Sequence, residues 1–480
     1  MTGTRRAAGG TGSRPAAVGS ATVRVVSAPA PGAALAVCAD VGSTFTKLAV
    51  VDVGTGALVA TAAHPTTVAT DVLDGLDAAL AALAGALGPV DLSRVYACSS
   101  AGGGLRLAVV GYESLVTAEA GHRVGLSAGA RVVHVATGKL TGAALAGLRA
   151  SRPDVILLVG GTDGGDAEVL LHNAARLAAA RTRVPVVVAG NADARDEVCA
   201  LLGGRGVRYV ATGNVLPRIG TLNPTPARAA IRDVFLRHVI GGKKLSRGRR
   251  FVDLVRGATP DLVLTGVELL ADDLGQDMLV LDIGGATTDV YSVLTPDPEQ
   301  LHGPRQEVAG TLWRSRTVEG DLGMRWSATG VVEAARAERL DVDDTLVEAA
   351  ARRSADPGML PRTDAEEADE LRIATLAAVV ALRRHSRGEP GGAPRKDLRD
   401  VRLVIGSGGV LRHATVRDAT AVLDGPLRDL SGGWPLPRAA RTVVDVEYVL
   451  APAGLLAAEH PDAARNLLRS QLLTVPAASR

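Results

Sequence analysis

Two aspartates, far apart in the chain, each end an apolar run and are followed by glycine and hydroxyl residues. Asp40 ends the first run, and the residues after it that could bind phosphate are Gly42, Ser43, Thr44, Thr46 and Lys47. Asp282 ends the second run, and the corresponding residues are Gly284, Gly285, Thr287 and Thr288. Phosphate binding needs accessible backbone N–H groups, hydroxyl donors and often a cation, which these residue types supply. The pair predicts two lobes that each offer one phosphate-binding hairpin to the same nucleotide.

Asp40, Asp282 and Lys47 are the predicted catalytic residues of this site. Both aspartates follow apolar runs that read as buried strands, where a carboxylate without a compensating charge is costly. A magnesium ion held largely through water, and in contact with the phosphates, would compensate both carboxylates. Lys47 could supply a point charge to the phosphates. For one hairpin alone, an aspartate that caps its own turn explains the pattern as well, but two matching hairpins favour the nucleotide site.

A third glycine-rich segment, residues 404–410, follows a predicted strand near the C-terminus. It contains Gly406, Gly408 and Gly409, and Leu411 stands where the GxGxxG dinucleotide motif needs its last glycine. Alone the segment is a weak signal. Beside the two hairpins, it suits close passage of the backbone next to an adenosine.

The composition argues against several other classes of protein. The 480 residues are 47% apolar and 22% charged, which provides enough apolar side chains for a packed core. A net charge of +2 argues against a dedicated nucleic-acid binder, which usually carries a concentrated basic face. The three cysteines form no CxxC pair, so a disulfide framework or a cysteine zinc site is not supported and a reducing cytoplasm is expected. No apolar stretch reaches the roughly 18 residues that a membrane span needs.

Hydrophobic periodicity and turn residues predict an α/β protein with three parts. Residues 1–33 have four arginines, no acidic residue and many small residues, and are expected to be a disordered extension. Residues 34–275 should form a first lobe with a possible inserted subdomain, and residues 276–480 a second lobe with the adenosine loop and a closing helix. Strands are predicted at residues 35–41, 47–53, 57–63, 94–99, 153–159, 184–188, 401–405 and 445–450. Helices are predicted at residues 71–87, 167–181, 226–239, 331–353, 363–384 and 453–468.

Taken together, these motifs resemble the actin, Hsp70 and sugar-kinase superfamily, whose members bind ATP between two ribonuclease H-like lobes. A tighter resemblance, over about residues 36–470, is to the glutamate mutase accessory family, also called MutL or GlmL and unrelated to mismatch repair. It rests on residues 40–47, 98–103, 158–165, 189–191, 281–290 and 316–325. The resemblance implies a two-lobed fold with a cleft, ATP and Mg²⁺ as cofactors, and slow ATP hydrolysis that reactivates an adenosylcobalamin-dependent mutase. None of the nine histidines lies in a DxHxxG cobalamin-ligand motif, so any cobalamin would be carried by that partner.

Several further residues have two explanations from sequence alone. Cys98 could be a nucleophile, but a buried small residue at a strand end is favoured because no base is evident nearby. Asp163 and Asp166 follow a buried strand in a glycine-rich loop, where either ligand contact or turn formation is expected. Glu319 and Asp321 could contact nucleotide or position water, or could mark a helix N-terminus.

Two other functions remain open for this fold. A small-molecule kinase would need a base near the γ-phosphate, and Asp163 is the candidate. The other is a nucleotide-dependent interaction protein. A pure interaction protein whose nucleotide site no longer functions is disfavoured by the intact Asp, Gly, Thr and Lys set of the two hairpins.

Overall fold

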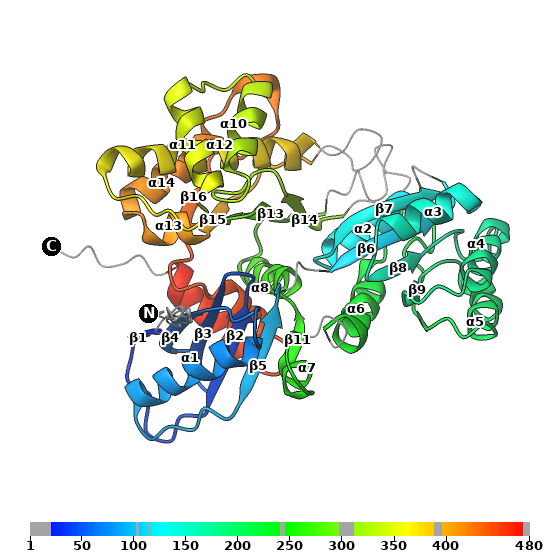
Figure 1. Ribbon diagram of the computed structural model, residues 1–480, viewed down its shortest axis with the longest axis horizontal. Helices are drawn as coiled ribbons and strands as arrows, with labels where there is room; N and C mark the ends of the chain where they lie inside the picture. The colour runs from blue at the N-terminus through cyan, green and yellow to red at the C-terminus, as the bar shows by residue number, and fades with distance from the viewer. Residues whose placement is uncertain are drawn as a thin grey trace, which may run out of the picture.

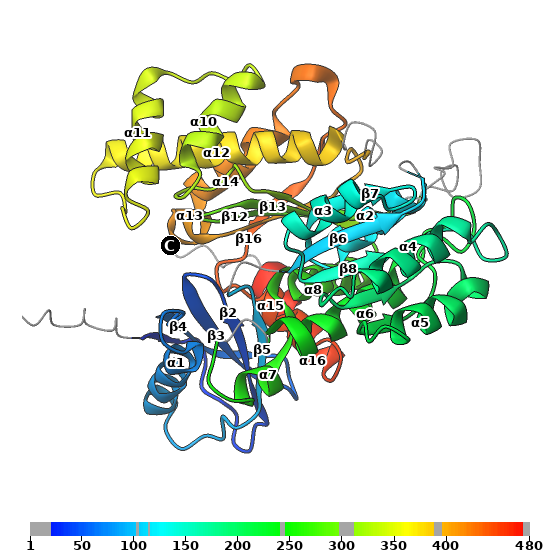
Figure 2. The same cartoon turned by 45° about the vertical axis from the view of Figure 1, so that its right-hand side comes forward.

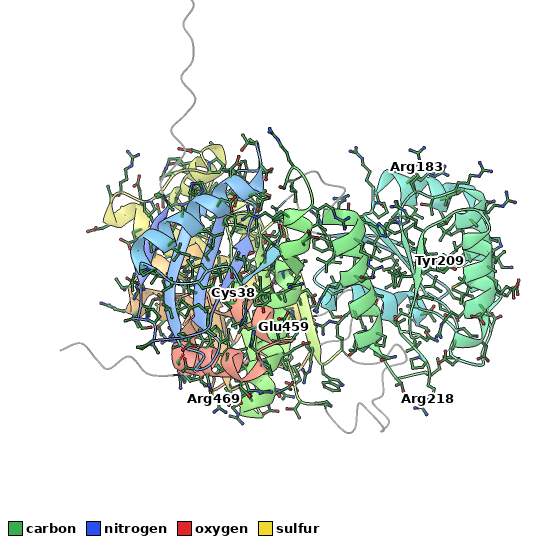
Figure 3. The ribbon with its side chains drawn as sticks, turned by 90° about the horizontal axis from the view of Figure 1, so that it is seen from below. Cys38, Arg183, Tyr209, Arg218, Glu459 and Arg469 are labelled. Atoms are coloured by element: carbon green, nitrogen blue, oxygen red, sulfur yellow. The ribbon has the colours of Figure 1, made fainter. Side chains whose placement is uncertain are left out.

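The computed structural model describes residues 21–101, 105–113, 116–240, 245–296, 312–387 and 396–473. Within these residues the strands form three sheets, of six, five and five strands. One unit is built on each sheet, and helix α8 (Thr259–Leu274) lies near the centre (Figure 1, Figure 2). We call these units the first lobe, the middle domain and the second lobe, in chain order. Seen from below, the middle domain lies to the side of the first lobe (Figure 3).

The first lobe is built on a mixed sheet. Its strands, in spatial order, are β1 (Thr22–Val25), β4 (Leu58–Pro65), β3 (Phe45–Asp52), β2 (Leu35–Val41), β5 (Val95–Ser99) and β11 (Val255–Ala258). Strands β2, β3 and β4 form an antiparallel meander, β5 adds parallel to β2, and β11 adds parallel to β5. Helix α1 (Val72–Leu87) packs on this sheet, and Asp71 caps it by accepting a hydrogen bond from the Leu73 N–H at 2.9 Å. The predicted meander, helix and following strand are confirmed; the short helix α7 (Arg250–Leu254) precedes β11.

Strand β1 corrects the expected boundary of the N-terminal extension. Thr22 pairs antiparallel with Ala63, and Val25 with Ala60, so regular structure begins before residue 34. Without β1, the backbone of β4 would be an unpaired sheet edge, and the added strand satisfies its N–H and C=O groups. Residues 1–20 of the expected extension lie outside the described part of the chain.

The second lobe repeats the topology of the first. Its strands, in spatial order, are β14 (Arg314–Glu319), β13 (Thr288–Val293), β12 (Met278–Ile283), β15 (Leu403–Ser407) and β16 (Arg441–Val444). Three antiparallel strands are again followed in space by two parallel ones. Numbered along the chain within each lobe, the meander and the two parallel strands run 3-2-1-4-5 in both sheets. This duplicated ribonuclease H-like arrangement is a two-lobed actin-like fold, so the predicted fold class is confirmed.

The helices of the second lobe are α10 (Ala328–Ala337), α11 (Asp344–Ala355), α12 (Asp364–Arg387), α13 (Gly409–His413) and α14 (Val416–Leu427). The prediction of one helix over residues 331–353 is wrong, because the chain turns between α10 and α11. Arg339 adopts a left-handed φ of 60° in this turn. Asp343 then starts α11 by accepting a hydrogen bond from the Leu346 N–H at 2.8 Å.

The last two helices, α15 (Leu450–Leu456) and α16 (Pro461–Leu468), return to the first lobe (Figure 1). Helix α15 crosses α8 at two glycines. A Cβ on Gly266 would lie 2.3 Å from the Leu450 carbonyl oxygen, and one on Gly454 would lie 1.9 Å from the Leu262 carbonyl oxygen. Only glycine permits this approach, which places the helix pair between the two mixed sheets.

The strand predicted at residues 445–450 is wrong. Strand β16 ends at Val444, and the Asp445 carboxylate accepts hydrogen bonds from the N–H groups of Val449 at 2.8 Å and Leu450 at 3.2 Å. These bonds satisfy backbone donors at the start of α15, so the segment begins a helix instead of extending a sheet. The predicted closing helix over residues 453–468 is correspondingly divided into α15 and α16.

The middle domain, inserted between β5 and β11, has a parallel sheet of its own. Its strands, in spatial order, are β10 (Tyr209–Ala211), β9 (Val186–Val188), β8 (Val155–Leu158), β6 (Arg106–Gly111) and β7 (Arg131–Thr137). Its helices are α2 (Thr117–Ser127), α3 (Gly142–Ala150), α4 (Glu168–Ala179), α5 (Arg195–Gly203) and α6 (Pro224–Val234). The subdomain that the sequence left open is therefore a separate α/β unit. Of the helices in the described part of the chain, none combines the length and apolar character that a membrane crossing requires.

Candidate functional site

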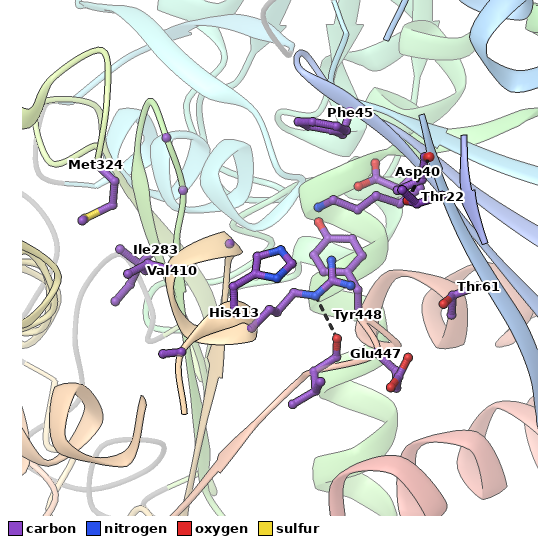
Figure 4. Close-up of a pocket in the computed structure, with 18 of the residues that line it drawn as sticks. Thr22, Asp40, Phe45, Thr61, Ile283, Met324, Val410, His413, Glu447 and Tyr448 are labelled. Atoms are coloured by element: carbon purple, nitrogen blue, oxygen red, sulfur yellow. Dashed lines mark hydrogen bonds between the residues drawn. The ribbon is translucent and has the colours of Figure 1, made fainter. Parts of the chain in front are cut away.

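A cleft of about 880 Å³ opens between the first and second lobes. Its lining includes residues from all three segments that the sequence singled out: Asp40, Lys47, Gly284, Gly285 and Gly409. Figure 4 shows Asp40 and Phe45 from the first lobe on one side, and Ile283 and Val410 from the second lobe on the other. Segments more than two hundred residues apart in the chain thus meet at one cavity.

Strand alternation turns the two aspartates toward the same interlobe core, and of the two only Asp40 also lines the cleft. On β2, Asp40 shares its face with Ala36 and Cys38, and on β12, Asp282 shares its face with Val280. Ala36, Cys38 and Val280 all belong to one apolar core, which α8 and α15 complete between the lobes. The two carboxylates therefore stand at the ends of strands that line a single interlobe core.

Asp40 is held rigidly at the cleft. Its side chain is 4% exposed, and its Oδ1 accepts a hydrogen bond from the Thr259 hydroxyl at 2.6 Å. The Cys98 thiol lies 3.6 Å from the same oxygen. Burial, and then the neighbouring Asp40, raise the pKa of the Cys98 thiol well above its usual range. A protonated thiol is a poor nucleophile, so Cys98 is the buried small residue that the sequence favoured.

Lys47 is the cross-strand partner of Asp40. Its ammonium nitrogen lies 3.4 Å from the centre of the Tyr448 ring, a close cation–π contact. Burial lowers the pKa of the Lys47 ammonium, while the carboxylates of Asp40 and Asp282 act to raise it. Tyr448 has a left-handed φ of 58°, which is a strained conformation for a bulky residue. Tyr448 could not be predicted from the sequence, because its position depends on the helix start that replaces the predicted strand.

Asp282 has a different environment, because its cross-strand partner is another acid, Asp289. Burial, and then Asp289, raise the pKa of Asp282 to about 6, while Lys47 and a hydrogen bond from Ser407 oppose that rise. Asp289 Oδ2 accepts a hydrogen bond from the Arg316 guanidinium at 3.0 Å. Asp289 Oδ1 is buried and has no hydrogen-bond partner among the described residues. An orphaned buried carboxylate oxygen calls for a cation or a water molecule, so the site fits a magnesium ion held through water.

Asp289 is a candidate site residue that the sequence reasoning missed. The available signal was its spacing, because Asp289 stands seven residues after Asp282, as Lys47 stands seven after Asp40. The described residues contain no group of three or more His, Cys, Asp or Glu side chains that could together hold a metal ion directly.

The turns of the two hairpins close in the same way. The Gly42 N–H donates to the Phe45 carbonyl at 3.0 Å, and the Gly284 N–H donates to the Thr287 carbonyl at 2.9 Å. A Cβ on Gly42 would lie 2.8 Å from the Phe45 oxygen, and one on Gly284 would lie 3.0 Å from the Thr287 oxygen. Glycine is therefore needed for the turn itself. Among the other predicted ligand residues, Ser43, Thr44 and Gly285 are exposed at the hairpin tips, and Thr287 is partly exposed.

Two predicted hydroxyl donors are corrected by the structure. Thr46 and Thr288 are fully buried. The Thr46 hydroxyl hydrogen-bonds the Thr66 hydroxyl at 3.1 Å, and the Thr288 hydroxyl donates to the Leu322 carbonyl at 2.5 Å. Neither threonine is among the residues that line the cleft, so these two hydroxyls are not placed to bind phosphate there.

The C-terminal glycines have three different roles. Gly406 is buried in β15, where a Cβ would come within 2.7 Å of Leu411, and it lies outside the cleft lining, so its predicted contact with nucleotide is not supported. Gly408 has a φ of 105°, and a Cβ there would lie 2.1 Å from the Ile283 oxygen, so it permits close backbone contact with β12. Gly409 alone of the three lines the cleft.

Arg325 adds a cation to the site, although the sequence indicated it only as part of the segment 316–325 that carries the family resemblance. Its backbone N–H donates to the Gly285 carbonyl at 2.8 Å, and its side chain lines the cleft. The guanidinium donates to Glu370 Oε1 at 2.6 Å, and the buried Arg353 donates to Glu370 Oε2 at 2.7 Å. This pairing fixes Arg325 beside the tip of the second hairpin.

Four acidic residues for which the sequence allowed either a ligand contact or a structural role do not line the cleft. Glu319 and Asp321 are both bound by Arg384, at 2.9 and 2.7 Å, and hold the turn after β14. Asp163, in the middle domain, accepts hydrogen bonds from the Ala192 N–H at 2.8 Å and the Asn214 amide at 2.9 Å. Asp166 accepts one from the Glu168 N–H at 2.9 Å, as a turn residue. None of the four is among the residues that line the cleft.

The cleft also has an apolar wall, above the charged floor of Asp40 and Lys47. Its apolar side chains come from both lobes: Phe45, Met324, Leu360, Leu371 and Val410. Phe45 is 47% exposed and Leu360 is 68% exposed, which leaves apolar surface available to a ligand. A cavity with a charged floor and an apolar wall suits a ligand that carries both an anionic and an aromatic part.

Fold and cleft together define a two-lobed actin-like protein with an interlobe site. The sequence profile of the family described as "MutL protein" matches residues 36–472. A relative named Protein MutL, from Clostridium tetanomorphum, is 37% identical over 463 residues, which cover 91% of this chain and 98% of that protein. The chain therefore belongs to the MutL protein family, as the sequence motifs indicated.

Two solved structures resemble the chain distantly. Nucleotide-free acetone carboxylase is 15% identical with a TM-score of 0.39, over 89% of this chain and 70% of that one. Xylulose kinase from Bifidobacterium adolescentis is 12% identical with a TM-score of 0.32, over 92% of this chain and 94% of that one. Similarity at this level carries no argument about function.

Proposed function

We propose that the cleft binds ATP with Mg²⁺. The observation that carries the proposal is the meeting of Asp40, Lys47, Asp282 and Asp289 beside the glycine turns of both hairpins. Lys47 and Arg325 would offset phosphate charge, and the exposed hairpin tips, residues 43–44 and 285–286, would offer backbone N–H groups. The apolar wall would cover the adenine ring.

The three aspartates would hold magnesium through water rather than by direct ligation. Magnesium, when bound, neutralises phosphate charge and polarises the phosphoryl oxygens. The unpartnered Asp289 Oδ1 supports this arrangement, because it offers an acceptor that the described protein groups leave unused. Asp282, with its pKa raised to about 6, is ionised at neutral pH and can accept a hydrogen bond from an attacking water. We expect slow hydrolysis at such a site.

We further propose that ATP binding and hydrolysis drive lobe closure and opening, and that the motion reactivates an adenosylcobalamin-dependent mutase. The site draws residues from both lobes, so ATP would bind the closed state better than the open one. A difference of ~5.5 kcal/mol in binding free energy would move the lobe equilibrium from 1:99 to 99:1. The pair α8 and α15, which packs between the sheets, would transmit the change. Membership of the MutL family supports the mutase as partner through the resemblance to its accessory proteins.

Calorimetric titration of Mg·ATP tests the site. Asp40→Ala and Asp282→Ala should each weaken binding about hundredfold, because each removes a charge-assisted contact. Asp163→Ala is the matched control, since that aspartate lies in the middle domain and outside the cleft lining. Wild-type affinity in both the Asp40 and the Asp282 variant would remove the proposed site.

Recovery of an inactivated mutase tests the role. Glutamate mutase that carries damaged cobalamin should regain activity when wild-type protein, Mg·ATP and fresh adenosylcobalamin are added, and should not regain it with Asp282→Ala. Recovery that is independent of ATP, or its absence with every mutase from the same organism, would rule out the reactivating role.

The kinase alternative has less support. Its candidate base, Asp163, makes two hydrogen bonds within the middle domain and does not line the cleft. A metabolite that stimulates ATP turnover, in the absence of any protein partner, would revive this alternative.

A further inference from the structure

One edge of the middle-domain sheet is lined with arginine. At the amino-terminal ends of its five parallel strands, or just before them, stand Arg106, Arg131, Arg152, Arg181, Arg183, Arg205 and Arg208. We call this set the arginine edge. Residues 105–240 contain 16 Arg and Lys against 10 Asp and Glu, a net charge of +6, although the whole chain is only +2. The middle domain therefore has a net positive charge larger than that of the whole chain.

Helix dipoles explain why some arginines occur at this edge of the sheet. The crossover helices α2 to α5 end at this side of the sheet, where cations stabilise the last turns. Arg106 donates to the Ser151 carbonyl at 2.7 Å, and Arg208 donates to the Arg183 carbonyl at 2.8 Å. These two arginines have a structural role that needs no partner.

The other five members of the arginine edge are not accounted for in this way. Their side chains are exposed, and in the described part of the chain their guanidinium groups form neither a hydrogen bond nor an ion pair: Arg131, Arg152, Arg181, Arg183 and Arg205. Surface arginines elsewhere often face an acid, as Arg250 does with Asp77 and Arg469 with Asp273. Five unpaired guanidinium groups in one region form an electrostatic surface that attracts anions.

Backbone strain at two of these positions also indicates that the arginines are not there to support the fold. Arg152 has a φ of 44° and Arg181 a φ of 46°, both left-handed. Each directly follows the last residues of a helix, α3 or α4, where glycine usually takes the left-handed position at no steric cost. After α5 the chain does use glycine, at Gly206 with a φ of 71°. Arginine at the two strained positions is thus not required by the fold.

The composition of the edge favours a protein partner over a nucleic acid. Tyr209, beside Arg208, is 39% exposed, and arginine and tyrosine are the residues enriched at protein interfaces. Aromatic residues form only 2% of the chain, so the stacking platforms typical of single-strand binding are scarce. Figure 3 shows Arg183 and Arg218 at opposite sides of the domain, so Arg218 provides a control site away from the edge.

We propose that the arginine edge docks an acidic face of the partner protein, which, resting on the proposed function, is the mutase. Docking there would couple the partner to the middle domain, while ATP acts at the separate cleft between the lobes.

The test compares two variants with two controls by biolayer interferometry at low and high salt. The variants are Arg152→Gly/Arg181→Gly, which removes charge and relieves strain, and Arg131→Gln/Arg205→Gln, which removes charge without a strained backbone. The controls are Arg218→Gln, from another side of the same domain, and Arg417→Gln, from the second lobe. The probes are glutamate mutase, poly-L-glutamate and oligothymidylate, and Mg·ATP affinity is measured in parallel.

Both edge variants should bind mutase and poly-L-glutamate with an association rate constant about tenfold lower, with a weaker salt dependence. Their Mg·ATP affinity should match the wild type, and their thermal stability should not fall below it. Mutase binding that is unchanged in both variants would overturn the docking surface and leave the proposed function standing. If the glycine variant loses stability, the arginines serve the helix ends, and the glutamine variant then decides the question.

Further outcomes distinguish failure of the proposed docking surface from failure of the proposed function. If the wild type binds no mutase, the proposed function fails, and poly-L-glutamate binding that depends on the edge arginines still supports an acidic docking site. Absence of binding to both acidic probes would overturn the docking proposal. Preferential, edge-dependent binding of oligothymidylate would replace the protein partner by a nucleic acid.

Discussion

The two hairpins share one backbone design but differ in how the carboxylate at the strand end is balanced. In the first, the cross-strand partner of Asp40 is Lys47. In the second, the partner of Asp282 is Asp289, and the compensating cation comes from the next strand as Arg316. The first hairpin is therefore nearly neutral on its own, whereas the second depends on a residue outside it.

The difference shows which hairpin has room for a further cation. Asp282 has its pKa raised to about 6, and Asp289 keeps one buried oxygen without a partner among the described residues. Arg316 meanwhile donates to the Gly129 carbonyl at 3.1 Å, so it links the second hairpin to the middle domain. The two similar hairpins thus differ in charge. The first contains its own cation, Lys47, whereas the corresponding residue of the second is the acid Asp289.

The largest effect should follow from removal of Arg316, the cation that pairs with Asp289. Arg316→Met leaves Asp289 buried without its partner, so the free energy of unfolding should fall by about 3–5 kcal/mol. Arg314→Met is the matched control, because Arg314 is on the same strand but pairs with Asp272 at the surface. Its loss should be below about 1 kcal/mol. Urea denaturation measures both, and equal losses would contradict the difference between the hairpins.

The next effect concerns the cation inside the first hairpin. Lys47→Met keeps the length of the side chain but removes the charge that faces Asp40 and Asp282, so Mg·ATP affinity should fall about hundredfold. Calorimetry measures the change. Lys139→Met serves as control, since Lys139 pairs with Glu168 on the surface of the middle domain. An affinity that Lys47→Met leaves intact would remove this lysine from the proposed site.

The pH dependence should be specific to the second hairpin. Because the pKa of Asp282 is raised in the folded protein to about 6, the folded state binds this proton more tightly than the unfolded state. The free energy of unfolding should therefore fall as pH rises from about 4, the unfolded value, to about 6. Mg·ATP affinity should rise over the same interval by up to about tenfold per pH unit, because magnesium competes with the proton.

Asp282→Asn separates this titration from others. The variant should lose the part of both pH dependences that is centred near pH 6, as followed by chemical denaturation and calorimetry from pH 4 to pH 8. An identical pH dependence in wild type and variant would assign it to another group.

The local part of the site could be predicted from sequence, because glycine turns and strand-end aspartates are encoded within a few residues. The sequence alone could not assign each side chain to one of the two faces of its strand. Thr46 and Lys47 are adjacent in a strand, so alternation excludes one of them from the cleft but does not say which. Only the packing of Lys47 against Tyr448 and of Thr46 against Thr66 decides it.

The remaining misses depend on contacts between distant residues. Strand β1 forms because β4 offers an open edge, and Arg316 enters the site because β14 pairs with β13. In the middle domain, strand β10 has only three residues, which carry too little periodicity to be recognised, whereas β9 lies within the strand predicted at residues 184–188. These features arise from tertiary structure, which overrides local propensity.

The smallest effect should come from the ring that supports Lys47. Tyr448→Leu removes the cation–π contact, which is worth about 1 kcal/mol, so Mg·ATP affinity should fall about fivefold. Tyr448→Phe retains the ring and should bind as the wild type does. Both variants keep a non-glycine residue at the left-handed φ of 58°, so their difference reports the ring and not the backbone. If phenylalanine weakens binding as much as leucine does, the hydroxyl matters instead of the ring. The position of Lys47 would then depend on its carboxylate neighbours alone.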